Sequence, residues 1–304
     1  MNKFIPIAYH RSYKLDVPKE HRFPMEKYEL LPKELVNQKI SNKSDFFSPS
    51  YPEWSTIIEV HEESYVLKLK NLKLTNSEIR KIGFPLSKEL INREFIITGG
   101  TIMGAEKAIR TKISMNIAGG THHSFSNRGE GFCLLNDQAI AASYLLKNHD
   151  IDKIMIIDLD VHQGNGTASI FKSNEKVFTF SMHGEKNYPF KKEKSDLDIG
   201  LKDNCSDYEY LTLLKNTLPS LIKKFKPNFV FYLSGVDVLN SDKLGRLSLS
   251  LEGCKERDRF VFSECLKNNI SVQCSMGGGY SQNINKIVEA HVNTYKMAKE
   301  VLTK

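Results

Sequence analysis

The sequence predicts an α/β fold in which a parallel sheet is covered by helices on both faces. Short apolar runs alternate with segments whose apolar residues recur every three or four positions, and this alternation is typical of parallel sheets. Each apolar run ends in a turn or a polar cluster, as buried parallel strands do. The chain has 304 residues, of which 40% are hydrophobic. This suits one sizeable core, so we expect a single domain over residues 1–304.

Six apolar runs are the predicted strands. They are Phe4–Tyr9, Ile113–Gly119, Lys153–Asp160, Lys176–His183, Asn228–Gly235 and Ile270–Gly278. Five of them end in unusual polar or glycine-rich motifs, namely "GGTHH", "DLDVHQGNG", "SMHG", "SGVD" and "SMGGGY". Ligands of open parallel sheets bind beyond the carboxyl ends of the strands. We therefore expect the functional site at that edge of the sheet.

Longer segments between these runs have helical periodicity. Leucines and a phenylalanine recur at three- and four-residue steps up to Phe225, and "SDYE" from Ser206 supplies a capping box at the start. The first hundred residues also have mostly helical patterns and are expected to form a layer on the sheet. The other predicted helices are Asn92–Thr111, Asn136–Lys147, Glu252–Lys267 and Asn283–Leu302.

Composition and charge indicate which partners and which cellular compartment to expect. Lysine and arginine exceed aspartate and glutamate by 43 to 36, a net charge of +7, and the basic run Lys186–Lys194 is typical of a solvated loop. Because these basic residues are typical of a solvated loop, we expect no nucleic acid as a partner. We also expect no membrane partner, because no apolar stretch approaches the ~20 residues of a membrane helix. The five cysteines form no C-x-x-C pair, and the start lacks the apolar run of a secretion signal. We expect free thiols and a soluble cytoplasmic protein, as a monomer or weak oligomer.

The stretch "GGTHHSFSNRGEGFC", from Gly119 to Cys133, places two titratable rings side by side in a glycine-rich loop. Glycines let a backbone turn sharply and approach a ligand closely. Histidine is the side chain that changes charge near neutral pH. Two such rings in one loop therefore suggest a chemical role and not an accident of composition.

A second motif indicates a metal. In "IIDLDVHQGNG" an apolar strand ends in Asp158, Asp160 and His162, which project to the same side if the strand geometry continues. Two carboxylates beside an imidazole are costly without a cation. Mixed oxygen and nitrogen ligands suit Zn²⁺, with Fe²⁺ or Mn²⁺ as alternatives. The competing interpretation is a polar loop in which Asp160 caps the next helix.

Asp237 is the candidate for a third ligand. It follows the predicted strand Asn228–Gly235 directly, so it lies at the same edge of the sheet as Asp160 and His162. Three protein ligands leave one coordination position open, which is typical of a catalytic rather than a structural zinc.

These motifs resemble the zinc-dependent histone deacetylase superfamily. The matching segments, in chain order, are "THHSFSNRGEGFCLLND", "DLDVHQGNGTASIF", "FSMHGEKNYPFKK", "SGVDVLNSDKLGRLSLS" and "MGGGYS". "HRFPMEKYELL" and "DVHQGNG" are most similar to class IV and bacterial class-IV-like members. The resemblance spans roughly residues 5 to 300. It implies the three-layer arginase/deacetylase fold, with a central parallel sheet of about eight strands.

The resemblance implies two kinds of bound cation. The zinc ligands of the family match Asp160, His162 and Asp237. The surroundings of its structural potassium ion match, partly through main-chain carbonyls, Asp158, Asp160, His162, Ser181 and Met182.

The resemblance also implies catalytic roles. His122 and His123 match the tandem histidines, Asp158 the carboxylate that orients the first of them, and Tyr280 the tyrosine opposite the metal. Many members have an aspartate where this chain has Asn165, the expected partner of His123, although class IV members also carry asparagine. An amide stabilises an imidazolium less than a carboxylate does. We therefore expect a lowered pKa for His123.

The implied activity is removal of an acyl group, acetyl or a longer fatty acyl, from lysine side chains of proteins. Metal-activated water would attack, the histidine pair would move protons, and Tyr280 would stabilise the oxyanion. The implied walls of the acyl-lysine tunnel are Gly131, Phe132, Phe190 and Leu244.

Three alternatives compete with this activity. A ureohydrolase needs a second metal, and the residue two positions after Asp237 is Leu239, not a carboxylate. A deacetylase of small amines such as acetylpolyamines can place a carboxylate at the tunnel mouth, where this chain has Leu244; it remains the main alternative. A binding module without activity would usually have lost a ligand or the tyrosine, and this chain keeps both.

Overall fold

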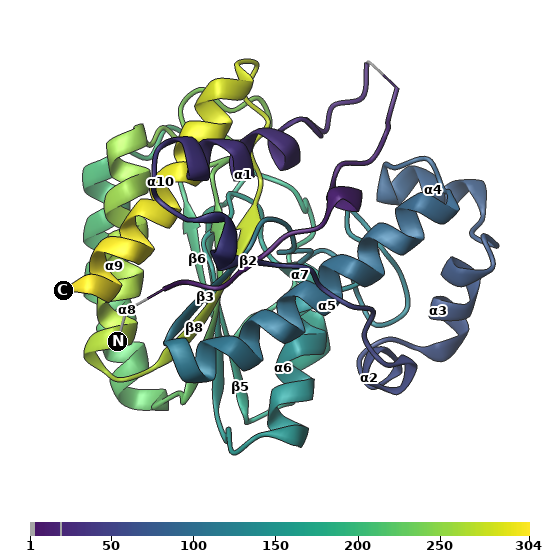
Figure 1. Cartoon of the computed structure of the whole chain (residues 1–304), viewed down its shortest axis with the longest axis horizontal. Coiled ribbons are helices and arrows are strands. Elements are labelled where there is room, and N and C mark those ends of the chain that lie inside the picture. Colours follow the sequence, from purple (N-terminus) through teal and green to yellow (C-terminus); the bar gives the residue numbers. More distant parts are fainter. Residues whose placement is uncertain (1–3, 19) are drawn as a thin grey trace.

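An eight-stranded parallel sheet forms the centre of the computed structural model, which describes residues 4–18 and 20–304 (Figure 1). The spatial order is β2-β1-β3-β8-β7-β4-β5-β6, and every pairing is parallel. The predicted fold class is therefore confirmed. The strands are β1 (Ile7–Ala8), β2 (Phe46–Phe47), β3 (Ile113–Asn116), β4 (Ile154–Asp158), β5 (Val177–Gly184), β6 (Leu197–Leu201), β7 (Phe229–Gly235) and β8 (Ser271–Gly277).

Helices cover both faces of this sheet. In Figure 1, α8, α9 and α10 lie on one side and α5 and α6 on the other, while α2–α4 form a lobe beyond α5. The α-helices are α1 (Lys27–Asn37), α2 (Trp54–Ile58), α3 (Glu63–Lys70), α4 (Asn76–Ile82), α5 (Lys88–Thr111), α6 (Asp137–Asn148), α7 (Asn165–Phe171), α8 (Asp207–Phe225), α9 (Leu251–Lys267) and α10 (Ile284–Thr303). Two short 3₁₀ helices occupy Arg11–Tyr13 and Lys43–Asp45.

The local sequence explains the main elements. Every residue of β4, β7 and β8 is buried, as continuous apolar runs in a two-sided parallel sheet require. Helix α8 begins with the predicted capping box, in which Ser206 and Glu209 cap each other's backbone N–H groups. Its buried residues recur every four positions from Tyr210 to Ile222, so one face packs on the sheet layer.

Three elements and several boundaries differ from the sequence prediction, and one of these boundaries bears on the candidate site. Strands β2 and β6 and helix α7 were not predicted, because β2 has two residues, β6 is a half-exposed edge strand and α7 has seven residues. Strand β4 ends at Asp158, not at Asp160. The condition under which Asp158, Asp160 and His162 would project to one side, a strand that continues to His162, is therefore not met.

The topology gathers the polar motifs at one edge. Strands β3, β8, β7 and β4 are neighbours in the middle of the sheet, and their carboxyl ends lead into His122–His123, Tyr280, Asp237 and Asp160–His162. All five cysteines are free, as predicted, and all five are also buried. None of the helices within residues 4–18 and 20–304 combines the length and hydropathy needed to cross a lipid bilayer.

Candidate active site

Asp160, His162 and Asp237 form a buried cluster whose ligand atoms all lie within 4.8 Å of one another. Nδ1 of His162 is 2.9 Å from Oδ1 of Asp160 and 3.2 Å from Oδ2 of Asp237. Oδ1 of Asp237 accepts a hydrogen bond from the backbone N–H of Val161 at 3.0 Å. Oδ2 of Asp237, although buried, has no hydrogen-bond donor among the described residues. Because an unpaired buried carboxylate oxygen is costly, this donor set fits a divalent cation.

The acid–base properties of this cluster support the same conclusion. Burial, and next the negative charge of Asp160, raise the pKa of Asp237 to about 7. Burial alone would lower the pKa of His162, but the neighbouring carboxylates of Asp160 and Asp237 raise it to about 10. The imidazole and the two carboxyl groups thus lie close enough together to stabilise a positive charge between them, as the ligands of a metal cation do.

Asp158 serves the first histidine of the pair. His122 donates through Nδ1 to Oδ2 of Asp158 at 2.6 Å, and Oδ1 of Asp158 accepts the backbone N–H of Asp160 at 3.1 Å. Burial lowers the pKa of His122, but the charge and hydrogen bond of Asp158 outweigh burial and raise it. His122 is therefore held in one orientation and favoured as an imidazolium.

His123 has the opposite character. Its Nδ1 lies 2.7 Å from Oδ1 of Asn165, and its ring centroid lies 4.1 Å from that of His122. Burial, followed by the positive charges of His122 and His162, moves the pKa of His123 well below its usual value. Because an amide oxygen can only accept, Nδ1 carries the proton and Nε2 keeps a free lone pair. The pKa of His123 is thus lowered, as expected, but by burial and neighbouring charge, while the hydrogen bond to Asn165 acts to raise it. In its neutral form His123 is suited to act as a base.

Helix α7 begins beside the two histidines. The structure of its N-terminus excludes the interpretation that Asp160 caps this helix. Its N-cap is Gly164, which makes no side-chain cap, and Asn165 is its first residue. Oδ1 of Asp160 instead accepts the backbone N–H of His162 at 2.9 Å. Asp160 is therefore not a helix cap.

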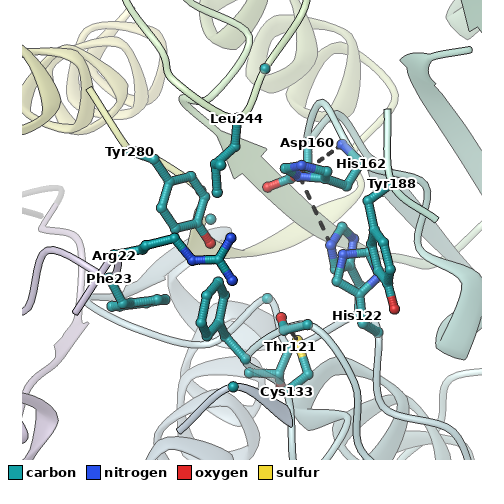
Figure 2. A pocket seen from close by; sticks show the side chains of 18 of the residues that line it. Arg22, Phe23, Thr121, His122, Cys133, Asp160, His162, Tyr188, Leu244 and Tyr280 are labelled. Carbon is teal, nitrogen blue, oxygen red and sulfur yellow. Dashed lines mark hydrogen bonds and ion pairs between the residues drawn. The ribbon is translucent and has the colours of Figure 1, made fainter. Parts of the chain in front are cut away.

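Tyr280 follows β8 and points its hydroxyl into the same cavity (Figure 2). Its backbone N–H donates to Oδ2 of Asp242 at 2.6 Å, and its ring lies 5.8 Å from Phe23 and 6.0 Å from Phe132, centroid to centroid. Burial, followed by the charges of Asp237 and Asp160, moves the pKa of Tyr280 well above its usual value. The phenol therefore stays protonated and can donate a hydrogen bond.

Glycine is required two positions before this tyrosine, at residue 278. Gly278 has a φ of +58°, and a Cβ there would lie 2.3 Å from the carboxyl carbon of Asp237. A larger residue would therefore be strained and would collide with Asp237 of the Asp160–His162–Asp237 cluster.

These side chains surround a cavity of about 710 Å³ that opens to the surface. Gly131, Phe132 and Leu244 line it, as predicted for the tunnel. Phe190 also borders it, but its side chain is 91% exposed at the mouth. Opposite Gly131 the wall is formed by Tyr188, whose ring meets that of His123 edge-on at 5.0 Å. Sequence reasoning did not identify Tyr188. It singled out Phe190, which lies two residues later in the same loop.

The residues predicted around a potassium ion lie together on β4, β5 and the loop after β4. Asp158 is in register with Ser181 across the β4–β5 pair, and Met182 follows Ser181. Asp158 and Ser181 therefore lie side by side on neighbouring strands. The ion itself stays a prediction.

Lys27 is a further cavity residue that sequence reasoning did not single out. It is 2% exposed, and its Nζ donates to the carbonyl oxygen of Gly278 at 2.5 Å. Nζ also lies 4.5 Å from the ring centroid of Phe23 and 5.6 Å from that of Tyr280. Burial lowers the pKa of Lys27 to about 7. Its only signal was its position in "HRFPMEKYELL", because a lysine seldom predicts burial.

Residues 21–295 match the family model described as "Histone deacetylase domain". The chain belongs to the histone deacetylase family. It is 41% identical over 296 residues to an uncharacterized protein of Picosynechococcus sp., covering 97% of this chain and 99% of that one. It is 28% identical to Histone deacetylase 2 of Arabidopsis thaliana over 297 residues, covering 93% of this chain and 76% of that one. The relationship makes this histone deacetylase family member a hydrolase of the deacetylase type.

A solved structure agrees on the fold. A histone deacetylase homolog from Aquifex aeolicus superposes with a TM-score of 0.83 at 22% identity, covering 99% of this chain and 89% of that one. This likeness confirms the predicted architecture. The closer likeness to class IV members stays a prediction.

Replacing Lys27 by methionine is expected to lower kcat/KM about tenfold, with a small change in Tm. Methionine fills a similar volume, but it leaves the Gly278 carbonyl without its hydrogen-bond donor, so the loop that carries Tyr280 is held less firmly. Steady-state kinetics and thermal unfolding measure the two effects. Lys299→Met is the matched control. Lys299, on α10, also donates a hydrogen bond to a backbone oxygen, that of Ile40 at 2.6 Å, but it does not line the cavity. Equal kcat/KM in both variants would contradict the effect.

Proposed function

We propose that this protein hydrolyses the amide between an acyl group and the side-chain nitrogen of lysine in proteins or peptides. The observation that carries the proposal is the convergence of three groups on one cavity. These are the Asp160–His162–Asp237 cluster, the neutral ring of His123, and the protonated hydroxyl of Tyr280. A metal, a base and a hydrogen-bond donor are what amide hydrolysis needs.

Zinc is the cation we propose for the cluster, with Fe²⁺ as the alternative, because two carboxylate oxygens and one imidazole nitrogen suit both. A cation held there would polarise the acyl oxygen and lower the pKa of a water molecule. The chain's own part is to hold the cation at the floor of the cavity. We further propose a structural potassium ion beside Asp158 and Ser181, which are in register across β4 and β5.

The histidines divide the proton chemistry. His123 accepts a proton from the attacking water at its Nε2 atom. It then passes this proton to the lysine nitrogen, which leaves as an amine. Its neutral state at the start follows from its lowered pKa. His122, oriented and charged by Asp158, stabilises negative charge on the reacting group. Tyr280 donates its hydroxyl proton in a hydrogen bond to the acyl oxygen as charge develops there.

The walls of the cavity favour acyl-lysine over a polyamine. Phe132, Tyr188 and Leu244 border the entrance with apolar or aromatic surface, which suits the methylene chain of lysine. The only acidic side chain among the described lining residues is Asp160, at the floor. A polyamine keeps further ammonium groups outside the tunnel, and this entrance offers them no carboxylate.

Purified, zinc-loaded protein should be assayed on peptides carrying acetyl-, short-chain and long-chain acyl-lysine, and in parallel on acetylated polyamines. We expect kcat/KM to be higher for at least one peptide than for every polyamine. His123→Ala is the control for turnover by contaminating enzymes, because it keeps the metal ligands and removes the base. Turnover of polyamines alone would overturn the proposed substrate class.

Replacing Asn165 by aspartate tests the assignment of His123 as the base. A carboxylate at this position stabilises the imidazolium of His123 and so raises its pKa. Since the base must be neutral to accept a proton, the acid limb of the kcat/KM profile is expected to move to higher pH. Activity therefore falls first at acidic pH, and the pH–rate profile measures the shift. An unmoved acid limb would mean that His123 is not the titrating base.

A further inference from the structure

The mouth of the active-site cavity is lined by exposed cations. They come from four separate parts of the chain: the segment before α1, the end of α4, the loop after β5 and the loop after β7. Four segments that are distant in sequence thus place the same sign of charge around one opening. The cations are Arg22, Arg80, Lys81, Lys186, Lys243 and Arg246.

Few carboxylates balance this charge. Asp203 pairs with Arg246 at 3.1 Å and lies 3.9 Å from Lys186. Within residues 4–18 and 20–304, the remaining four cations of the mouth form no salt bridge. The mouth therefore carries a net positive charge.

The other nearby carboxylates are already engaged. Glu130 accepts hydrogen bonds from Arg128 at 2.7 Å and from the hydroxyl of Tyr188 at 2.8 Å. Asp242 accepts the backbone N–H groups of Tyr280, Leu244 and Gly245. Neither is free to bind a cationic substrate.

Arg22 is the cation best placed to touch a substrate. Its guanidinium carbon lies 5.9 Å from the ring centroid of Phe132. In Figure 2 its side chain reaches from beside Tyr280 and Phe23 toward the middle of the pocket that it lines. An arginine presents a planar fork of donors that matches a carboxylate. A peptide whose acyl-lysine enters the cavity must pass its neighbouring residues across this group.

We propose that the mouth selects acyl-lysines flanked by aspartate or glutamate, a specificity that rests on the proposed function. The flanking carboxylates bind Arg22 and Lys243 at the rim, while the acyl group lies at the floor. Lysine or arginine at the same peptide positions is repelled. The net charge of +7 acts in the same direction, since it speeds the encounter with acidic segments. A carboxylate on the acyl chain itself would lie at the floor and would not meet these cations.

Three peptides of equal length test the proposal, each with one acyl-lysine and with flanks of Asp/Glu, Asn/Gln or Lys/Arg. We expect kcat/KM to be about tenfold higher for acidic than for neutral flanks at low salt, and lowest for basic flanks. The difference should shrink with added NaCl, because the charges at the mouth are exposed to solvent. A fourth peptide, with neutral flanks and a carboxylate on the acyl chain, should show no comparable salt dependence.

The double variant Arg22→Glu/Lys243→Glu is expected to abolish or reverse the preference for acidic flanks. Lys215→Glu is the matched control: Lys215 is an exposed lysine of α8, outside the cavity lining, and should leave the preference intact. Equal kcat/KM for acidic and neutral flanks, or a preference unchanged in the double variant, would overturn the proposal while leaving lysine deacylation standing. No turnover of any of the peptides would overturn both.

Discussion

Tyr280→Phe is expected to lower kcat/KM about 10²- to 10³-fold, the usual effect of losing one donor to a developing oxyanion. The change keeps the ring that packs against Phe23 and Phe132 and removes only the hydroxyl. The backbone bond from residue 280 to Asp242 also remains. Tm and metal content should therefore stay near those of the wild type.

Tyr188→Phe is the matched control for this prediction. It removes the Tyr188 hydroxyl, which donates to Glu130 at 2.8 Å and not to a residue of the Asp160–His162–Asp237 cluster. Its effect on kcat should be much smaller. If Tyr280→Phe binds metal normally and retains more than half of the wild-type rate, Tyr280 does not stabilise the oxyanion.

Asp237→Asn is expected to abolish high-affinity metal binding and, with it, activity. The amide keeps an oxygen for the Val161 N–H, but it replaces the carboxylate oxygen that lacks a partner. In the metal-free protein this change removes a buried charge beside Asp160, so the variant should unfold at the same temperature as the metal-free wild type or higher. Zinc at about 100 times Kd should stabilise the wild type by about 2.7 kcal/mol, and the variant far less.

Elemental analysis and thermal unfolding with and without zinc separate these effects. Asp152→Ala is the control, because Asp152 is an exposed carboxylate just before β4, at the far end of that strand from the cluster. A variant with the metal content and zinc-induced Tm shift of the wild type would exclude Asp237 as a ligand.

The sheet was largely predictable because its strands are buried on both faces. Their sequences are nearly continuous apolar runs, and β4, β5, β7 and β8 lie within one or two residues of the predicted ranges. The edge strand β6, "LDIGL", mixes a carboxylate and a glycine with apolar residues, because only its last residue is buried. Such an edge has no continuous apolar signal to detect.

The candidate site was predictable as a set of strand ends but not as a set of contacts. Parallel topology brings the residues after β3, β4, β7 and β8 to one edge, so their closeness followed from their order. Which carboxylate faces which partner depends on where β4 ends. Because it ends at Asp158, that side chain meets His122, and only Asp160 joins His162 and Asp237.

Contacts across the fold had no local signal. Lys27 meets Gly278 across 251 positions of sequence, and no periodicity in either segment indicates that contact. The mouth cations likewise come from segments that only the folded chain brings around one opening. Sequence patterns therefore identified the residues that converge in the candidate site better than those that hold them in place or line its mouth.

Hydrolysis of an acyl-lysine peptide in water enriched in ¹⁸O tests the central claim most directly. The zinc-loaded protein should release free lysine amine and a carboxylic acid that carries one heavy oxygen from the solvent, because water is the nucleophile. Mass spectrometry of both products measures the outcome. Absence of the free amine, or a carboxylic acid formed without solvent oxygen, would contradict the proposed hydrolysis at the Asp160–His162–Asp237 site.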